Sequence, residues 1–186
     1  MKNVIAICGL ETIQADDNVT HPDTFLDNVL TWKRDHKSDH VSIIDARNFI
    51  DNNDPMGSLW DELKAQSQAK PIDILLYSGH SGSLMLYVFL NTRQDLDDVH
   101  RLISMGTDWD EVKFSPVANV WLMGCQTGGQ EGAKFDVCIA QDIATKTRAT
   151  VWGFVYKSSQ QHRKDGGWEM RPEHGDYVKF SPSQKH

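Results

Sequence analysis

Two short glycine-rich segments carry the residue types that can do covalent chemistry. The first, residues 78–82, reads Ser-Gly-His-Ser-Gly and contains His80; the second, residues 124–129, reads Gly-Cys-Gln-Thr-Gly-Gly and contains Cys125. A histidine beside a cysteine lowers the pKa of the thiol and acts as its base and later as an acid. The two segments therefore predict nucleophilic catalysis by a thiolate, with glycines that let backbone N–H groups approach a developing oxyanion.

Both segments follow an apolar run that is typical of a buried strand. Residues 72–77 precede the histidine segment, and residues 117–123 precede the cysteine segment. Ligands of open parallel sheets bind beyond the carboxyl ends of the strands. If these two strands are neighbours, about 5 Å apart, His80 and Cys125 reach one cleft.

The rest of the chain alternates between strand and helix patterns. Helices are expected after residues 21–24, from Asp54-Pro55 to Lys70-Pro71, over 95–105 and over about 133–146. Further strands are expected at 3–8, 41–46, 150–156 and 177–180, with an extra strand or hairpin at 84–90. This alternation predicts an α/β fold with a mostly parallel central sheet and helices on both faces.

The order of the two strands and their glycine-rich segments resembles the caspase-like cysteine peptidases, among them metacaspases, clostripain and the CHAT domains. The resemblance spans roughly residues 4–156, and His80 and Cys125 stand 45 positions apart. It implies a caspase-like three-layer sandwich and a thiol protease, a hydrolase in which His80 is the general base and Cys125 the nucleophile. It also implies an oxyanion hole built from the backbone N–H of Cys125 and of a residue just after the histidine, Ser81 or Gly82.

The resemblance also implies a polypeptide substrate, no cofactor, and room for an activating partner or a small ligand. The side chain before the cut would lie in a pocket near the fourth and fifth predicted strands. Candidate pocket residues are Asp45, Gln126, Lys157, Ser158 and Asp165. The acidity of the chain favours a basic residue there, whereas the net positive tail favours an acidic one, and the preference stays open.

Two other functions compete with the peptidase. One is a binding or regulatory module that keeps the fold without cleaving peptides. The other is a serine hydrolase, because residues 79–83 are similar to the G-x-S-x-G elbow with Ser81 as nucleophile, although the fifth position is Ser83. That hydrolase would need a later histidine such as His162 or His174.

The remaining cysteines and histidines are expected to be structural. Cys8 and Cys138 lie in apolar surroundings and are interpreted as core thiols. His36 and His40 stand four residues apart without the glutamate of H-E-x-x-H, so a solvated helix end is expected rather than a metal site.

Composition sets the outer limits. The chain has 186 residues, a net charge of −7 and three cysteines. We expect a single domain with a core at about 1–156 and a loop-rich tail at 157–186, and no separate pro-domain. The acidity disfavours nucleic acid as a partner, no apolar run approaches the roughly 20 residues of a membrane span, and the odd cysteine count suits the cytoplasm.

Overall fold

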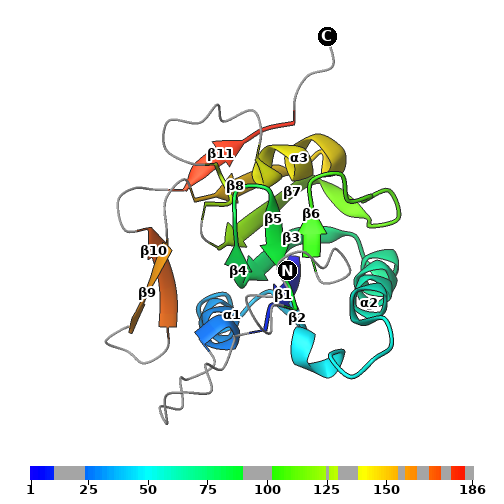
Figure 1. Cartoon of the computed structure of the whole chain (residues 1–186), viewed down its shortest axis with the longest axis horizontal. Helices are drawn as coiled ribbons and strands as arrows, with labels where there is room; N and C mark the ends of the chain where they lie inside the picture. Colours follow the sequence, from blue (N-terminus) through cyan, green and yellow to red (C-terminus); the bar gives the residue numbers. More distant parts are fainter. Residues whose placement is uncertain are drawn as a thin grey trace.

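The computed structural model describes residues 1–10, 24–89, 102–124, 126–129, 138–154, 158–162, 168–172 and 177–182. Within them, six strands form one sheet in the order β11-β8-β7-β3-β1-β2 (Figure 1). The strands are β1 (Asn3–Cys8), β2 (His40–Asp45), β3 (Ile72–Ser78), β7 (Phe114–Met123), β8 (Thr150–Gly153) and β11 (Val178–Phe180). All neighbours pair in parallel except β8 and β11, so the predicted α/β class with a mostly parallel sheet is confirmed.

The central strands are buried along almost their whole length. Every residue of β1 is buried, and in β3 only Asp73 is partly exposed. Parallel strands that are covered on both sides need uninterrupted apolar runs, which is why the sequence located these strands well.

Three helices and one 3-10 turn accompany the sheet: α1 (Thr24–Asp35), α2 (Pro55–Ala69), α3 (Ile139–Thr147) and η1 (Ala46–Asn48). The Asp54 carboxylate caps α2 by accepting from the Gly57 N–H at 2.9 Å, with Pro55 at the first helical position as predicted. Among the helices in the described part of the chain, none is long and apolar enough to cross a membrane.

Alternate residues of β1 belong to two different core clusters. Ile5 and Ile7 lie in the larger cluster with residues of α2 and α3, such as Leu63. Val4 lies in the smaller cluster, together with Val29 of α1. Successive side chains of a strand point to opposite faces, so Val4 and Ile5 lie on opposite faces of the sheet.

A small antiparallel sheet follows β3 and corrects one helix prediction. It consists of β4 (His80–Ser81), β5 (Met85–Tyr87) and β6 (Leu102–Ser104). Of the extra strand or hairpin expected at 84–90, the structure confirms a strand, β5, but the helix expected over 95–105 is wrong at residues 102–104. There Ile103 is buried opposite Leu86, so pairing with β5 overrides the helical spacing of the apolar residues; residues 95–101 lie outside the described part.

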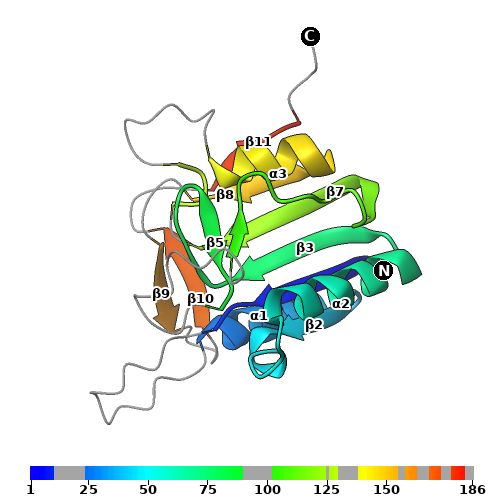
Figure 2. The same ribbon diagram turned by 45° about the vertical axis from the view of Figure 1, so that its right-hand side comes forward.

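The tail also contains more regular structure than expected. β9 (Ser158–His162) and β10 (Trp168–Pro172) form an antiparallel hairpin beside α1 (Figure 2), where a loop was predicted. The sequence of β9 is polar and lacks the alternating apolar pattern of a half-buried strand, so the sequence alone does not predict this strand. The strand expected at 177–180 is confirmed as β11, which joins the central sheet.

The third helix begins later than predicted in the described part of the chain. α3 starts at Ile139, and residues 133–137 lie outside the description. Cys138 is thus the N-cap residue rather than a mid-helix one, although it is fully buried as expected for a core thiol.

Replacing Asp54 tests its role as the cap of α2. Asp54→Ala removes the acceptor for the Gly57 N–H, and we expect it to lower the free energy of unfolding by about 1 kcal/mol. Chemical denaturation measures the change. Asp51→Ala, in the exposed turn before the helix, is the control and should leave stability within about 0.5 kcal/mol of the parent; an equal loss in both would contradict the capping role.

Candidate active site

The pairing of β3 with β7 brings the two glycine-rich segments to one edge of the sheet. Ser78, the last residue of β3, lies opposite Met123, the last residue of β7. Both strands point toward the same edge (Figure 2), so the chain leaves them side by side. The condition set for a shared cleft, that these two strands are neighbours, is met.

The two segments touch at Gly124, the residue before Cys125. A Cβ atom placed on Gly124 would lie 2.1 Å from the Ser81 Oγ and 2.9 Å from the Gly79 carbonyl oxygen. Gly79 and Ser81 flank His80 in the sequence. Only a glycine fits at this point, and the chain neighbours of the predicted nucleophile and of the predicted base are therefore in contact. Cys125 itself lies outside the described residues.

The backbone of His80 is held by a buried tyrosine. The Tyr77 hydroxyl donates to the His80 carbonyl at 2.6 Å, and Tyr77 is 1% exposed. A Cβ on Gly79 would come within 2.5 Å of that hydroxyl oxygen, so the glycine leaves room for the bond. Burial raises the pKa of Tyr77 well above its ordinary value, and the hydroxyl keeps the proton that it donates.

The ring of His80 also has a fixed neighbour. Phe25, near the start of α1, meets it edge-on with 5.0 Å between the ring centroids. Phe25 is buried and His80 is half-buried. The imidazole thus sits between apolar packing on one side and partial exposure on the other, as a group that exchanges protons with a substrate requires.

The register of the β4–β5 hairpin distinguishes the two oxyanion-hole candidates. The Gly82 N–H donates to the Met85 carbonyl at 2.9 Å, and His80 lies opposite Tyr87. In an antiparallel pair, hydrogen-bonded positions recur at every second residue, so Ser81 directs its N–H away from β5. The Gly82 N–H is therefore engaged within the hairpin, and the Ser81 N–H does not belong to the β4–β5 ladder.

The cysteine segment ends in a tight turn with a buried threonine at its centre. Gln126 has a φ of 57°, and its carbonyl accepts from the Gly129 N–H at 2.9 Å. The Thr127 hydroxyl, fully buried, accepts from the Phe154 N–H at 3.0 Å and donates to the Leu122 carbonyl at 3.3 Å. Thr127 thereby ties the turn to the ends of both β7 and β8.

Sequence reasoning missed Tyr77, Phe25 and Thr127 as supports of the site. The signal for Thr127 was present, because a polar residue between glycines at the end of a buried strand must find hydrogen-bond partners. From the sequence, Tyr77 is interpreted only as the last apolar residue of its strand. Phe25 lies 55 positions from His80, and nothing in the local pattern of α1 connects the two.

The remaining pocket candidates are not brought to this point by the described structure. Asp45 ends β2, which β1 separates from β3, and its carboxylate accepts from the Arg47 Nε at 3.0 Å. Ser158 begins β9 in the hairpin beside α1. Lys157 and Asp165 lie outside the described residues. Of the predicted pocket residues, Gln126 is the one whose position next to the contact at Gly124 is described.

The structure also bears on the two other chemistries considered from the sequence, a serine hydrolase at Ser81 and a metal site at His36 and His40. A G-x-S-x-G elbow needs a turn from a strand into a helix, whereas Ser81 lies in a hairpin strand. His36 is exposed and stacks on Trp32, while His40 begins β2. In the part of the chain that the structure describes, no group of three or more His, Cys, Asp or Glu side chains could hold a metal ion.

Comparison of the chain with protein-family models, curated proteins and solved structures gives no match. The resemblance to caspase-like peptidases therefore rests on the two glycine-rich segments themselves. Their placement at the ends of neighbouring parallel strands is what the structure adds to it.

The contact at Gly124 predicts the effect of a single added methyl group. Gly124→Ala would push a Cβ into the Ser81 side chain and the Gly79 carbonyl, and we expect a loss of about 1–3 kcal/mol in the free energy of unfolding. The double variant Gly124→Ala with Ser81→Gly removes the nearest colliding atoms. Thermal denaturation of the single and double variants should show partial recovery, and strictly additive losses would contradict the contact.

The Tyr77 hydroxyl predicts a pH-dependent effect. Tyr77→Phe removes the bond to the His80 carbonyl, and we expect stability to fall by about 1 kcal/mol at neutral pH. Because the pKa of Tyr77 is raised on folding, the parent keeps the tyrosine contribution below about pH 10 and loses it as the pH rises further. The stability difference between parent and variant should therefore narrow above pH 10 in denaturation measurements; a constant difference would contradict the assignment.

Proposed function

We propose that the chain is a cysteine endopeptidase in which His80 and Cys125 form the catalytic dyad. The observation that carries this proposal is the contact of Gly124 with Gly79 and Ser81 at the carboxyl edge of β3 and β7. It puts the chain neighbours of a histidine and a cysteine against each other where parallel sheets bind their ligands. No metal or organic cofactor is needed for this chemistry.

The proposed architecture is the caspase-like three-layer sandwich, with helices on both faces of the sheet. Its support is the division of the core: Val29 of α1 clusters with Val4, whereas Leu63 of α2 clusters with Ile5. Since Val4 and Ile5 are successive residues of β1 and point to opposite faces, this division supports the placement of α1 and α2 on opposite faces.

The proposed reaction proceeds in two stages. His80 takes the proton of the Cys125 thiol, the thiolate attacks the scissile carbonyl carbon, and His80 then gives the proton to the leaving amine as the C–N bond breaks. Water then attacks the thioester, with His80 accepting its proton, and releases the new carboxyl group and the thiol. Over the two stages, one water is consumed, one peptide bond is hydrolysed and the Cys125 thiol is regenerated.

The backbone N–H groups of Ser81 and Cys125 are the proposed donors to the oxyanion. The hairpin register supports Ser81, because its N–H faces away from β5 while the Gly82 N–H is bonded to Met85. Gln126 directly follows the nucleophile in a left-handed turn and is the proposed wall of the pocket for the residue before the cut.

A peptide electrophile that traps thiolates tests the proposal. A peptidyl chloromethyl ketone should label the parent chain at Cys125, as located by mass spectrometry of the digested protein. Cys125→Ala should abolish the labelling and reduce cleavage of a casein substrate by at least about a thousandfold, and His80→Ala should reduce both by about a hundredfold or more.

Cys8 and Cys138 provide internal controls, because both are buried and should stay unlabelled in the folded protein. Cys138→Ala is the matched variant that should retain labelling and cleavage. Loss of activity in Ser81→Ala with full activity in Cys125→Ala would establish the serine alternative instead. A parent chain that neither labels nor cleaves would favour the non-catalytic binding module.

A further inference from the structure

A pocket separate from the candidate site lies on the sheet face that carries Val4. Its volume is about 220 Å³, and its floor includes Ile74 and Asn119, which pair across β3 and β7. Ile74 stands four residues before Ser78, at the opposite end of β3 from the His80 segment. The pocket is therefore separate from the proposed catalytic site.

Four aromatic rings in two stacked pairs form its walls. Trp121 and Trp152, on neighbouring strands, stack with 5.0 Å between their centroids and an angle of 7°. Trp32 and His36, at the end of α1, stack at 4.2 Å and 12°. Trp32 and Trp121 meet at 6.2 Å with a tilt of 49°, so the two pairs enclose a wedge.

The rings are held in place before any ligand arrives. The Trp152 indole N–H donates to the Asn119 side-chain oxygen at 3.3 Å, and Tyr177 packs edge-on against Trp121 at 5.0 Å. A ring nitrogen of His36 bonds the Trp32 carbonyl at 2.9 Å. A preformed aromatic surface binds without the entropic cost of ordering its side chains.

The rim of the pocket offers hydrogen-bond donors and acceptors in balance. Lys2 and Asp39 both line it, and the Lys2 backbone N–H donates to the Asp39 carboxylate at 3.0 Å. One ammonium and one carboxylate offset each other, so neither an anion nor a cation gains from the local charge. A neutral ligand that both donates and accepts hydrogen bonds satisfies the two groups at once.

We propose that this pocket binds one pyranose ring of a neutral carbohydrate. The C–H face of a pyranose packs on the half-buried indole surface that lines the pocket, and its hydroxyls donate to Asp39 and accept from Lys2. The volume equals about seven waters at roughly 30 Å³ each, which suits a single sugar ring and is below the roughly 300 Å³ at which sites for drug-sized molecules begin.

The geometry disfavours the other flat ligands. A nucleobase sandwiched between two parallel rings needs about 7 Å between them, because each contact takes roughly 3.5 Å. Trp32 and Trp121 are closer than that and tilted, so only one-sided packing is open. The net charge of −7 also opposes the phosphates of a nucleic acid, and the paired charges of Lys2 and Asp39 give a quaternary ammonium ion no net attraction.

Titration of the full chain with a panel of methyl glycosides tests the proposal. Saturation-transfer NMR should show the strongest transfer to the C–H protons of one ring face of the glycoside that binds, and the tryptophan fluorescence should change with the same dissociation constant. Trp121→Ala should weaken binding about tenfold or more.

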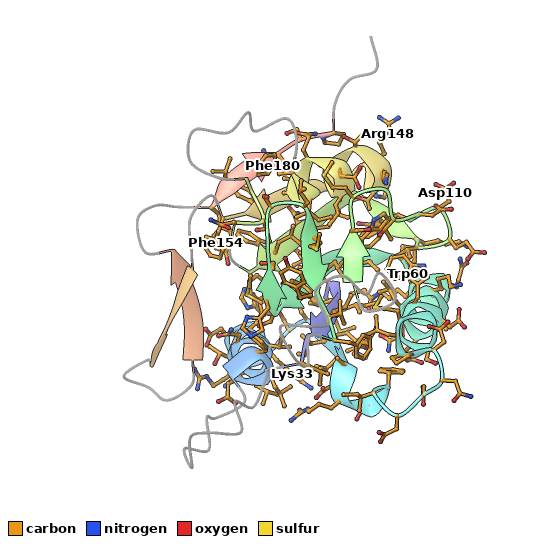
Figure 3. The ribbon with its side chains drawn as sticks, viewed as in Figure 1. Lys33, Trp60, Asp110, Arg148, Phe154 and Phe180 are labelled. Atoms are coloured by element: carbon orange, nitrogen blue, oxygen red, sulfur yellow. The ribbon has the colours of Figure 1, made fainter. Side chains whose placement is uncertain are left out.

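The matched control is Trp60→Phe. Trp60 lies on α2 (Figure 3), edge-on to Trp109 at 4.9 Å in the other core cluster, and its replacement should leave glycoside binding unchanged. Asp39→Asn, on the rim, gives a second test should Trp121→Ala fail to fold. The asparagine keeps an oxygen that accepts from the Lys2 N–H, so the fold should be retained. It lacks the charge that strengthens the hydrogen bond from a sugar hydroxyl, so binding should weaken several-fold.

Failure of this proposal is distinguishable from failure of the proposed peptidase. Cys125→Ala should bind the glycoside as the parent does, since the pocket lies at the other end of the strands. Absence of binding by every glycoside in the panel overturns the proposal. Equal binding by the parent and Trp121→Ala, or tighter binding of adenosine or tetramethylammonium than of any glycoside, overturns it as well.

Discussion

The backbone N–H groups at the start of α3 connect the two segments on which the candidate site depends. A helix leaves its first N–H groups without partners inside the helix, and Cys138 offers no side-chain cap. The Ile139 N–H donates to the Ser83 carbonyl at 2.7 Å, and the Ala140 N–H donates to the Thr127 carbonyl at 3.2 Å. One carbonyl follows His80 and the other follows Cys125, so the same helix end holds both segments.

This arrangement works because the sheet has already placed the two strands. β3 and β7 end opposite each other; the chain continues from β3 into the short strand β4, which pairs with β5, and from β7 into the turn at residues 126–129. Beside them, Phe154, which follows β8 (Figure 3), forms two hydrogen bonds with the cysteine segment: its carbonyl accepts from the Gly128 N–H at 2.7 Å, and its N–H donates to the Thr127 hydroxyl at 3.0 Å. The hydrogen bonds that a loop needs are thus supplied by strand ends and a helix end, and the loop conformation is determined by tertiary structure.

The sequence located what depends on local pattern and missed what depends on pairing. β1 and β3 are uninterrupted apolar runs, and the capping of α2 by Asp54 is a local signal. The strand at Leu102–Ser104 exists only because β5 lies beside it, and β9 exists because β10 does. The orientation of the Ser81 N–H likewise follows from register across the hairpin, which no spacing in the sequence specifies.

The helix α1 contacts both His80 and the aromatic pocket. Phe25 touches the ring of His80, and Trp32, seven residues later, lines the wedge, a rise of about 10 Å along the helix. A ligand in the aromatic pocket can change the site at His80 only if α1 has two alternative placements and the ligand binds them with different affinities. Asn119 and Tyr177 hold Trp152 and Trp121 on the sheet side, and Trp32 already faces Trp121 with α1 in its present position. A sugar that binds this preformed wedge would therefore anchor the chain to a glycan without altering the chemistry at His80.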